Sequence, residues 1–362
     1  MSIKIQSNIR DYEVFFCESH DFLNNFSQYE PYCYVIDETV WNLYGDRLFK
    51  NTTDKTRIII PINEDLKTLS SVQRLYDQLT KYSAKRNLTM ISIGGGILQD
   101  ITGFVASTLY RGINWIFVPT TLLAQADSCI GSKTSLNYGG FKNLIGTFYP
   151  PSKIFIYPEF LKTQADLDFY SGLGEVVKLH IMDGLIKTRE LLDVLPSIRR
   201  KETLSLLKAI NNSLLIKKSY ISDDEFDSGR RNLLNFGHCF GHALESTSQF
   251  EIPHGQAVVL GLLLANIVAV NRDLLSSKMH AYITENLLLP SLVIKPKKEH
   301  FDSEAIIEAM KKDKKRTGNE LALVMMNEDF KNIRVNNLKP SEAAQAIAES
   351  IRYFDELKYF KS

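Results

Sequence analysis

Net charge is almost absent from this chain. Its 362 residues include 43 Lys and Arg against 42 Asp and Glu, which gives a formal net charge of +1. This balance creates no field of one sign that would attract a nucleic acid or an anionic membrane surface. Cysteine is scarce as well, because only Cys17, Cys33, Cys129 and Cys239 occur and none has CxxC spacing. Four scattered thiols predict reduced cysteines and no disulfide framework.

Long apolar runs, repeats and low-complexity segments are missing too. The segment that begins Met-Ser-Ile-Lys lacks a signal-peptide core, and no apolar run is expected to span a membrane. Hydrophobic residues make up 44% of the chain, as in ordinary globular proteins. A chain of this length favours two domains over one. We therefore expect a two-domain cytoplasmic protein without a membrane or nucleic-acid partner.

What the chain does contain is a change of pattern near residue 165. Strands are predicted before it at Tyr32–Ile36, Arg57–Ile60, Met90–Ile93, Trp115–Val118 and Ile154–Ile156, with helices at Leu66–Ser83 and Leu98–Leu109. This alternation predicts a parallel sheet covered by helices, a Rossmann-like α/β domain over residues 1–165. Helices are predicted after it at Ser171–Lys187, Lys201–Ser222, Gly229–Ser248, Ala257–Arg272 and Ser303–Lys311, with a strand pair at Ala322–Met326 and Asn332–Val335. Residues 166–362 are therefore predicted to form a mostly α-helical domain.

The segment from Arg231 to Glu245 carries the strongest chemical signal. As one helix, it would place Arg231, Asn235, His238 and His242 on a single face, because side chains three or four positions apart stack. A solvated face that happens to carry two histidines is one explanation. A polar stripe on an otherwise apolar helix is costly to bury, however, unless it faces an ion or a ligand. The stripe therefore favours the wall of an anion-binding site that contains a metal.

Glycines and charged loops follow several predicted strands. Gly94-Gly95-Gly96 joins a strand to a helix, where backbone N–H groups and the helix dipole attract a pyrophosphate. A packing turn also explains such a run of glycines, and a charged surface loop also explains any one of the neighbouring charges. Those charged or polar loop residues are Arg111, Asp127, Lys133, Lys142 and Asn143. Because ligands bind at the carboxyl edge of a parallel sheet, this set predicts a nucleotide or phosphate site.

A carboxylate and a further histidine stand in later elements. Glu175 and Lys178 share one helical face among apolar residues, where a surface ion pair is the alternative interpretation. His254 precedes an apolar helix. One carboxylate and two histidines from separate elements would complete a zinc shell with open positions. The sequence spacing alone does not bring them together.

The order of these motifs resembles the 3-dehydroquinate synthase family of the sugar phosphate cyclase superfamily. The resemblance runs from about Asp37 to Lys315. Its motifs are Gly94–Gly96 with Asp100, Arg111-Gly112, Pro119–Gln125 with Asp127, Lys133-Thr134, Lys142-Asn143, Gly174-Glu175 with Lys178, Leu234–His242 and His254-Gly255. It implies a sugar phosphate substrate, the cofactors NAD and Zn²⁺ (or Co²⁺), a homodimer, and an active site in the cleft between the two domains.

The resemblance also implies roles for individual residues. The metal ligands would be Glu175, His238 and His254. The catalytic and substrate contacts would be Arg111, Asp127, Lys133, Asn143, Lys178, Lys217, Arg231, Asn235, His242 and Lys314, with Lys218 and Lys315 as adjacent alternatives. The nucleotide contacts would be Asp37, Asn63, Glu64, Lys67, Gly95, Gly96, Asp100, Thr120, Thr121, Asp127, Lys133, Lys142, Phe160 and Thr163.

The implied reaction converts 3-deoxy-D-arabino-heptulosonate 7-phosphate to 3-dehydroquinate and phosphate through transient oxidation by NAD, elimination, reduction and aldol closure. The chain departs from the family at Ser132, Ser135, Asn63 and Gly174, where the family commonly has Gly, Gly, Gly and Ala, and at Gln256, where an acid is frequent. These departures leave open a sister cyclase that acts on sedoheptulose 7-phosphate or glucose 6-phosphate. A polyol dehydrogenase that releases NADH and a non-catalytic binding protein are two further candidate functions.

Overall fold

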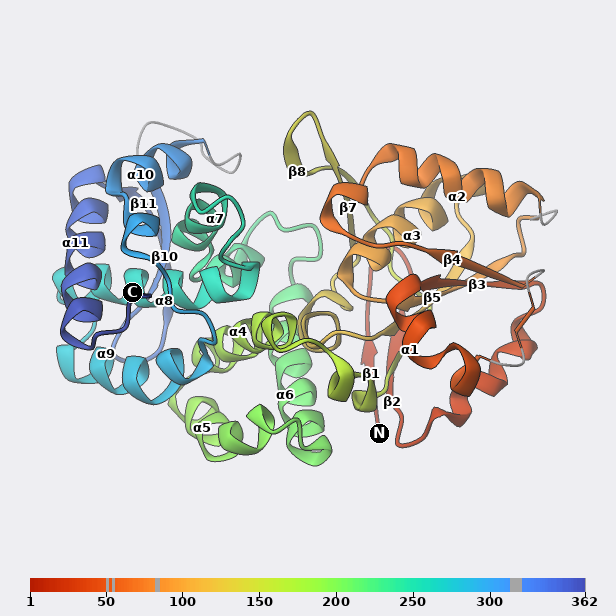
Figure 1. Cartoon of the computed structure of the whole chain (residues 1–362), viewed down its shortest axis with the longest axis horizontal. Coiled ribbons are helices and arrows are strands. Elements are labelled where there is room, and N and C mark those ends of the chain that lie inside the picture. Colours follow the sequence, from red (N-terminus) through yellow and green to blue (C-terminus); the bar gives the residue numbers. More distant parts are fainter. Residues whose placement is uncertain (50–51, 54–55, 82–84, 313–320, 362) are drawn as a thin grey trace. The chain divides into compact units, whose positions relative to one another are not determined.

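The structure, a computed structural model, describes residues 1–49, 52–53, 56–81, 85–312 and 321–361. The chain forms two compact units, both drawn in Figure 1. The first, here the α/β unit, comprises Met1–Thr163 and Ile221–Phe226. The second, here the helical unit, comprises Gln164–Tyr220 and Asp227–Ser362. The predicted fold class, an α/β part followed by a mostly α-helical part, is confirmed.

A seven-stranded sheet forms the centre of the α/β unit, with the strand order β1-β2-β9-β6-β5-β3-β4. The strands are β1 (Ser2–Ile5), β2 (Tyr12–Phe16), β3 (Tyr32–Asp37), β4 (Arg57–Ile60), β5 (Thr89–Gly94), β6 (Asn114–Pro119) and β9 (Lys153–Ile156). Neighbouring strands run parallel, except that β1 is antiparallel to β2. All the strands predicted for this region are present, with ends that agree within one residue, whereas β1 and β2 were not predicted.

Helices cover both faces of this sheet because side chains alternate along each strand. Ile91 of β5 lies in one apolar cluster with Val40 of helix α1 (Glu38–Leu48). Ser92, the next residue, faces the other way and its Oγ accepts a hydrogen bond from Thr102 of helix α3 (Gly96–Thr108) at 2.9 Å. The remaining helices of the unit are α2 (Leu69–Lys81) and the short η1 (His20–Tyr29), η2 (Glu64–Leu66), η3 (Leu109–Arg111), η4 (Ala124–Ser128) and η5 (Pro158–Thr163).

The strand order reverses between β3 and β5. The chain passes from β3 to β4 on one side and then returns to β5 on the other side of β3. In open α/β sheets, ligands bind at the carboxyl ends of the strands that flank such a reversal. Here those ends carry Asp37 and Gly94, and a Cβ atom on Gly94 would lie 3.1 Å from Asp37 Cβ. Glycine therefore allows Asp37 and Leu98 to approach the end of β5 closely.

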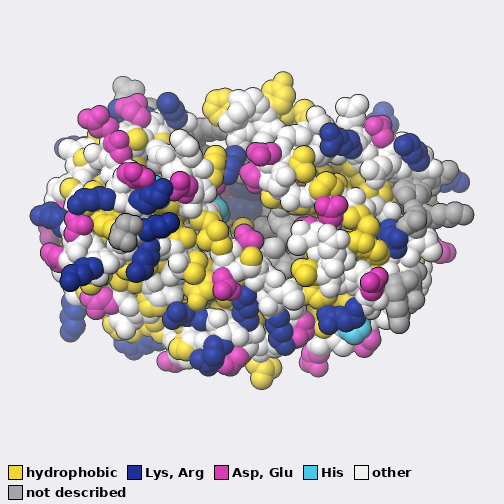
Figure 2. All heavy atoms as spheres, viewed as in Figure 1, with side chains coloured by type: hydrophobic (Ala, Val, Ile, Leu, Met, Phe, Trp, Pro, Cys, Tyr) yellow, Lys and Arg dark blue, Asp and Glu magenta, His cyan; other side chains and the backbone are white. Residues whose placement is uncertain are grey.

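A hairpin of β7 (Lys133–Tyr138) and β8 (Phe141–Phe148) completes the unit and was not predicted. Tyr138 and Phe141 at its turn are exposed, and hydrophobic side chains project there at the top edge of Figure 2. Over the rest of the face in Figure 2, acidic and basic side chains are interspersed.

A late segment of the chain, Ile221–Phe226, joins the α/β unit through Glu225. Its carboxylate accepts hydrogen bonds from Ser7 Oγ at 2.6 Å, from the Asn8 backbone N–H at 2.7 Å and from Ser132 Oγ at 2.7 Å. Ser132 adopts a φ of 65°, a conformation that glycine takes more easily. The hydrogen bond to Glu225 thus gives a structural role to a serine that replaces the family's glycine.

The helical unit is built around α8 (His254–Asn271). Its other elements are α4 (Asp166–Met182), α5 (Leu185–Arg199), α6 (Thr203–Ile221), η6 (Arg230–Asn235), α7 (His238–Thr247), α9 (Ser277–Ile283), η7 (Thr284–Leu288), η8 (Leu289–Ser291), η9 (Lys298–Phe301), α10 (Ser303–Lys311), α11 (Pro340–Glu356) and the antiparallel pair β10 (Leu321–Met326) and β11 (Asn332–Leu338). Helix α8 is long and apolar enough to cross a membrane, contrary to the prediction that no such run exists. It is 83% buried, however, and packs against α4, α7 and α11 as a core helix.

Two predicted helices are wrong because a glycine interrupts each of them. The predicted helix Gly229–Ser248 is instead η6 followed by α7, with Gly237 between them at a φ of 78°. A Cβ atom there would lie 2.7 Å from the carbonyl oxygen of Val258 in α8, so only glycine fits. Likewise, Gly184 at a φ of 103° separates α4 from α5 inside the predicted helix Ser171–Lys187.

Candidate active site

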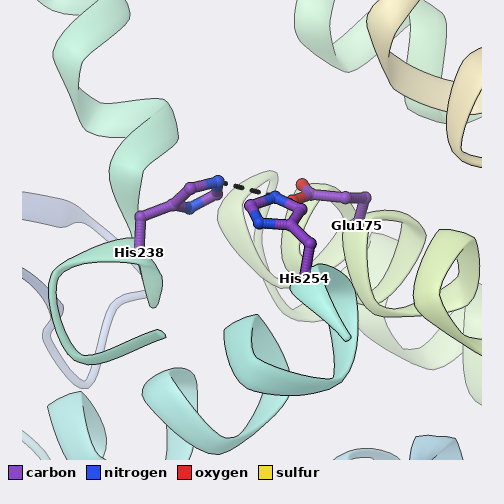
Figure 3. Close-up of side chains that lie close together, drawn as sticks. All are labelled: Glu175, His238 and His254. Atoms are coloured by element: carbon purple, nitrogen blue, oxygen red, sulfur yellow. Dashed lines mark hydrogen bonds and ion pairs between the residues drawn. The ribbon is translucent and has the colours of Figure 1, made fainter. Parts of the chain in front are cut away.

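Three helices of the helical unit bring a carboxylate and two imidazoles together (Figure 3). Glu175 comes from the middle of α4, while His238 and His254 are the first residues of α7 and α8. Nε2 of His238 lies 3.4 Å and Nε2 of His254 lies 3.2 Å from the same oxygen, Glu175 Oε1. The three ligand atoms all lie within 4.8 Å of one another. Nitrogen and carboxylate oxygen donors in this number suit zinc, so the residues present fit a metal ion.

Glycine makes this convergence possible. A Cβ atom on Gly174 would collide with the backbone oxygen of Gly255, and one on Gly255 would collide with that of Ser171. The backbones of α4 and α8 therefore touch directly beside Glu175 and His254. Gly174, which stands where the family commonly has alanine, is explained by this close approach.

Lys178 neutralises the other side of the carboxylate. Its Nζ lies 2.5 Å from Glu175 Oε2, and the two side chains are 3% and 1% exposed. Burial on its own would raise the pKa of Glu175, but the Lys178 ammonium and the two histidines outweigh it and hold that pKa well below its usual range. Glu175 is therefore an ionised carboxylate with one oxygen on a lysine and the other on two ring nitrogens.

The two candidate ligand histidines differ in their electrostatic surroundings. Burial, together with the charge of Lys178, lowers the pKa of His238. Burial would also lower the pKa of His254, but hydrogen bonds to Glu175 and Glu245 outweigh it and raise that pKa above its usual value. His242 is close to both, with ring-centroid distances of 5.1 Å to His238 and 5.7 Å to His254, yet it is not a member of the ligand group.

The helical unit contains a cavity of about 90 Å³ next to His238, one of the three candidate metal ligands. It is lined by Asn232, Asn235, His238, Cys239, His242, Met310, Ala322, Leu323, Val324 and Arg334. Asn235, His238 and His242, three members of the predicted polar stripe, thus line one cavity. They do so although the single helix predicted for this segment is interrupted at Gly237. Arg334 on β11 was missed because no spacing in the sequence links β11 to α7, and Cys239 was missed although it follows His238 directly.

The remaining predicted cations of the helical unit lie elsewhere. Arg231 is buried at 4% exposure and does not line this cavity. Lys217 on α6 is buried at 7% exposure, whereas its alternative Lys218 is only half-buried. Lys314 and Lys315 lie outside the described residues.

In the α/β unit, several predicted nucleotide residues form one hydrogen-bonded network. Lys67 is 6% exposed and its Nζ contacts both Asp100 Oδ2 and, at 2.6 Å, Asn143 Oδ1. Asp100 also accepts from the Ser135 backbone N–H at 2.9 Å and from Ser135 Oγ at 3.1 Å. Ser135 Oγ lies 2.9 Å from Asn143 Oδ1 as well. Ser135, like Ser132, thus has a definite contact at a position where the family has glycine.

The other predicted residues of this unit occupy the ends of strands or their loops. Asn63 Oδ1 accepts from the Leu66 backbone N–H at 2.9 Å and caps η2. Glu64 accepts a hydrogen bond from Asn137 at 2.8 Å, and the Thr120 N–H donates to Gly94 O at 2.9 Å. Thr121, Gly95 and Gly96 lie beside this turn, Asp127 lies in η4, Lys133 begins β7, Lys142 lies in β8, and Arg111 ends η3 in an exposed position.

Phe160 and Thr163 lie in η5, the short helix that follows the end of β9. Phe160 is buried and its ring packs edge-on against Tyr44. Thr163 Oγ1 lies 2.6 Å from the hydroxyl of Tyr44. Phe160 is therefore a core residue, whereas Thr163 is exposed, and neither contact gives a sign of a ligand.

Comparisons with known proteins agree with this arrangement. Residues 57–171 match the model of the 3-dehydroquinate synthase N-terminal domain, and residues 172–316 match that of the C-terminal domain. The chain is 36% identical over 323 residues to a 3-dehydroquinate synthase from Clostridium tetani, covering 88% of this chain and 85% of that one.

Two solved structures share the fold. One is the 2-epi-5-epi-valiolone synthase from Streptomyces hygroscopicus with NAD⁺ and Zn²⁺ bound, at a TM-score of 0.82 and 24% identity, covering 97% of this chain and 99% of that one. The other is 2-deoxy-scyllo-inosose synthase complexed with carbaglucose-6-phosphate, NAD⁺ and Co²⁺, at a TM-score of 0.78 and 23% identity, covering 96% and 100%. The fold class is therefore that of the sugar phosphate cyclases.

The sequence comparisons define the family within that class. The chain belongs to the 3-dehydroquinate synthase family, and it is an enzyme of the phosphate-eliminating cyclase type. This confirms the family that the order of the motifs predicted.

Proposed function

We propose that this enzyme converts 3-deoxy-D-arabino-heptulosonate 7-phosphate to 3-dehydroquinate and phosphate, with NAD and a divalent metal, Zn²⁺ or Co²⁺, as cofactors. The observation that carries the proposal is the convergence of His238 and His254 on one oxygen of Glu175, while Lys178 takes the other oxygen. The relatives at 30% identity or more support the substrate, and the two solved cyclases with NAD⁺ and a metal support the cofactors.

In the helical unit, some of the site residues would bind the metal and others would bind the substrate. Glu175, His238 and His254 would hold the metal with positions left open for the substrate. When bound, the metal polarises a substrate hydroxyl and NAD takes up and returns one hydride. Asn235 and His242 face the adjoining cavity, where they would orient the substrate and move a proton.

Buried cations of this unit suit an anionic substrate. Arg231 and Lys217 are almost inaccessible to water, and an ionic hydrogen bond in such surroundings is stronger than one at the surface. Elimination and aldol steps develop negative charge, which positioned cations stabilise. The burial of Lys217 favours it over Lys218 for this role.

The α/β unit supplies the nucleotide-binding role. Gly94, Gly95 and Gly96 lead from β5 into α3, at the strand-order reversal where a pyrophosphate is expected. We assign Asp37 beside them, and the network of Lys67, Asp100 and Asn143, to contacts with the nucleotide and the substrate. Residues 1–165 would then be the NAD-binding domain and residues 166–362 the metal- and substrate-binding domain.

The test is phosphate release from 3-deoxy-D-arabino-heptulosonate 7-phosphate with Zn²⁺ and a catalytic amount of NAD, with identification of the product. We expect 3-dehydroquinate and no net NADH, since oxidation and reduction cancel within one turnover. Faster turnover of sedoheptulose 7-phosphate or glucose 6-phosphate would indicate a sister cyclase instead. Stoichiometric NADH would indicate a polyol dehydrogenase.

We further place the enzyme in the cytoplasm as a homodimer. The four cysteines are all free thiols in the structure, as expected for a reducing compartment. Light scattering after size-exclusion chromatography tests the dimer, because a mass near 41.3 kDa would mean a monomer.

A further inference from the structure

Both ligand imidazoles are held through their second nitrogen, but by different partners. Nδ1 of His238 donates to the backbone carbonyl of Phe236 at 3.2 Å. Nδ1 of His254 donates to Oε2 of Glu245 at 3.1 Å. Both Nδ1 atoms are therefore donors, and Nε2 is the nitrogen of each ring that faces Glu175 Oε1 in the candidate metal group. One histidine is therefore fixed by a neutral group of its own segment and the other by a charged side chain of another helix.

Glu245 is placed for this contact by the packing of α7 on α8. It lies seven residues after His238, two turns along the same face of α7, and is 8% exposed. The two helices approach closely at Gly241, which has no side chain. A Cβ atom at this position would lie only 3.0 Å from Ala257 O. Such close packing leaves Glu245 little freedom, so the imidazole of His254 has a rigid anchor.

We propose that Glu245 is a positioning residue for the metal centre. It fixes the ring orientation and the tautomer of His254, and its negative charge makes that imidazole a better ligand for a divalent cation. In many metal sites, a carboxylate accepts a hydrogen bond from the ring nitrogen of a ligand histidine that does not bind the metal. Loss of such a carboxylate weakens metal binding about 10–100-fold. The inference rests on the proposed function insofar as the ion held by Glu175, His238 and His254 is the resident metal.

A neighbouring pair offers a matched control. Glu251 accepts a hydrogen bond from His300 Nε2 at 3.2 Å, the same residue types at nearly the same distance, and also pairs with Lys297. Glu251 is exposed, and neither residue belongs to the candidate metal group of Glu175, His238 and His254. Replacing Glu251 therefore removes a carboxylate–imidazole contact but changes no residue of the candidate metal site.

The experiment compares Glu245→Ala and Glu245→Gln with Glu251→Ala and Glu251→Gln in the full chain. Zn²⁺ affinity is measured by competition with a chromogenic chelator, and the ligand field is followed by the visible absorption of bound Co²⁺. We expect Glu245→Ala to weaken Zn²⁺ binding about 10–100-fold and to change the Co²⁺ spectrum. Glu245→Gln, whose amide oxygen still accepts from Nδ1, should lose less, and both Glu251 variants should match the wild type.

Wild-type affinity and an unchanged Co²⁺ spectrum in the Glu245 variants would overturn the proposal. An equal loss in the Glu251 variants would overturn it as well. If Glu245→Ala does not fold, Glu245→Gln decides alone, because the loss of charge still predicts a several-fold weaker site. Failure of the wild type itself to bind Zn²⁺ or Co²⁺ would refute the metal in the proposed function, which is a different outcome.

Discussion

A lysine–carboxylate pair with a buried lysine is found in each of the two units, and the two pairs differ in what else the carboxylate contacts. In the α/β unit, Asp100 meets Lys67 and also accepts two hydrogen bonds from Ser135, so both of its oxygens have donors. In the helical unit, Glu175 meets Lys178 with one oxygen only, and its other oxygen faces two Nε2 atoms. Both oxygens of Asp100 thus have hydrogen donors from other residues of the protein, whereas Glu175 belongs to a group that could hold a metal ion.

The pKa directions of the two carboxyl groups follow this difference. Burial raises the pKa of Asp100 despite the opposing charge of Lys67. For Glu175, Lys178 and the histidines outweigh burial and lower the pKa. The comparison teaches that an ion pair alone does not mark a catalytic centre, since the remaining neighbours of the carboxylate decide its role.

The largest effect is expected from Glu175→Gln, which removes the negative charge that faces the buried ammonium of Lys178. Breaking a buried pair in this way costs about 3–5 kcal/mol of unfolding free energy. Urea unfolding followed by far-ultraviolet circular dichroism measures this loss, and chelator competition should detect no Zn²⁺ site. Glu308→Gln is the matched control, because Glu308 and Lys311 have the same spacing and order at exposed positions of α10. A loss above about 1 kcal/mol in that control would contradict the role of burial.

The next largest effect is a loss of unfolding free energy at low pH, caused by the buried His180. His180, on the same helix as Glu175, is fully buried, its Nδ1 contacts Val176 O, and burial lowers its pKa to about 4 from 6.5. The unfolded chain takes up this proton below pH 6.5, whereas the folded chain does so only near pH 4. The free energy of unfolding should therefore fall by up to about 3 kcal/mol as the pH drops through this window.

Urea unfolding of the wild type and of His180→Gln at pH 7 and pH 5 measures this dependence. The variant should lose part of the pH dependence, while His20→Gln, at an exposed position, should retain all of it. Identical pH dependence in His180→Gln and the wild type would contradict the assignment.

A smaller effect is expected from Asp100→Asn in the α/β unit. Lys67 retains its contact with Asn143, so we expect a loss of about 1–3 kcal/mol together with weaker NAD binding. Both tryptophans, Trp41 and Trp115, lie in this unit, so their fluorescence reports its unfolding. Zn²⁺ affinity should be unchanged, and a loss of the metal site in this variant would break the comparison between the two pairs.

The smallest effect is expected from Ser135→Ala. It removes the hydroxyl contacts with Asp100 and Asn143 but keeps the backbone contact, at a cost of about 1 kcal/mol. Calorimetric titration with NAD should show modestly weaker binding. Ser152→Ala, which removes a single hydrogen bond to Trp115 O, is the control and should leave NAD affinity unchanged. Equal NAD affinities in the two variants would mean that the hydroxyl of Ser135 does not contribute to NAD binding.

The buried parallel strands were predictable because each is a short run of β-branched and apolar residues. The hairpin of β7 and β8 was not, since residues of β8 are mostly exposed or half-buried and carry no pattern. Helices α1, α5, α9 and α11 were missed as well, although α11 has apolar residues at helical spacing that mark its buried face. The switch from η6 to α7 depends on the contact of Gly237 with α8, which is distant in sequence.

The candidate metal ligands were predictable as residue types, because a carboxylate and two histidines stand among apolar neighbours. Their convergence depends on glycine contacts between α4 and α8, which no local pattern contains. Glu245 was missed for the same reason, since only the packing of α7 on α8 brings it to His254. The one signal in the sequence was its position seven residues after His238, on the same helical face.

The late segment Ile221–Phe226 has a consequence for dissecting the protein. A fragment that ends at Thr163 would lack Glu225, and with it the acceptor for Ser7, Asn8 and Ser132. Expressing the first part of the chain alone therefore removes a component of its own unit. The chain passes between the two units three times, so a single cut cannot separate them. A complete α/β unit would need residues 221–226 joined to residues 1–163 by an artificial linker.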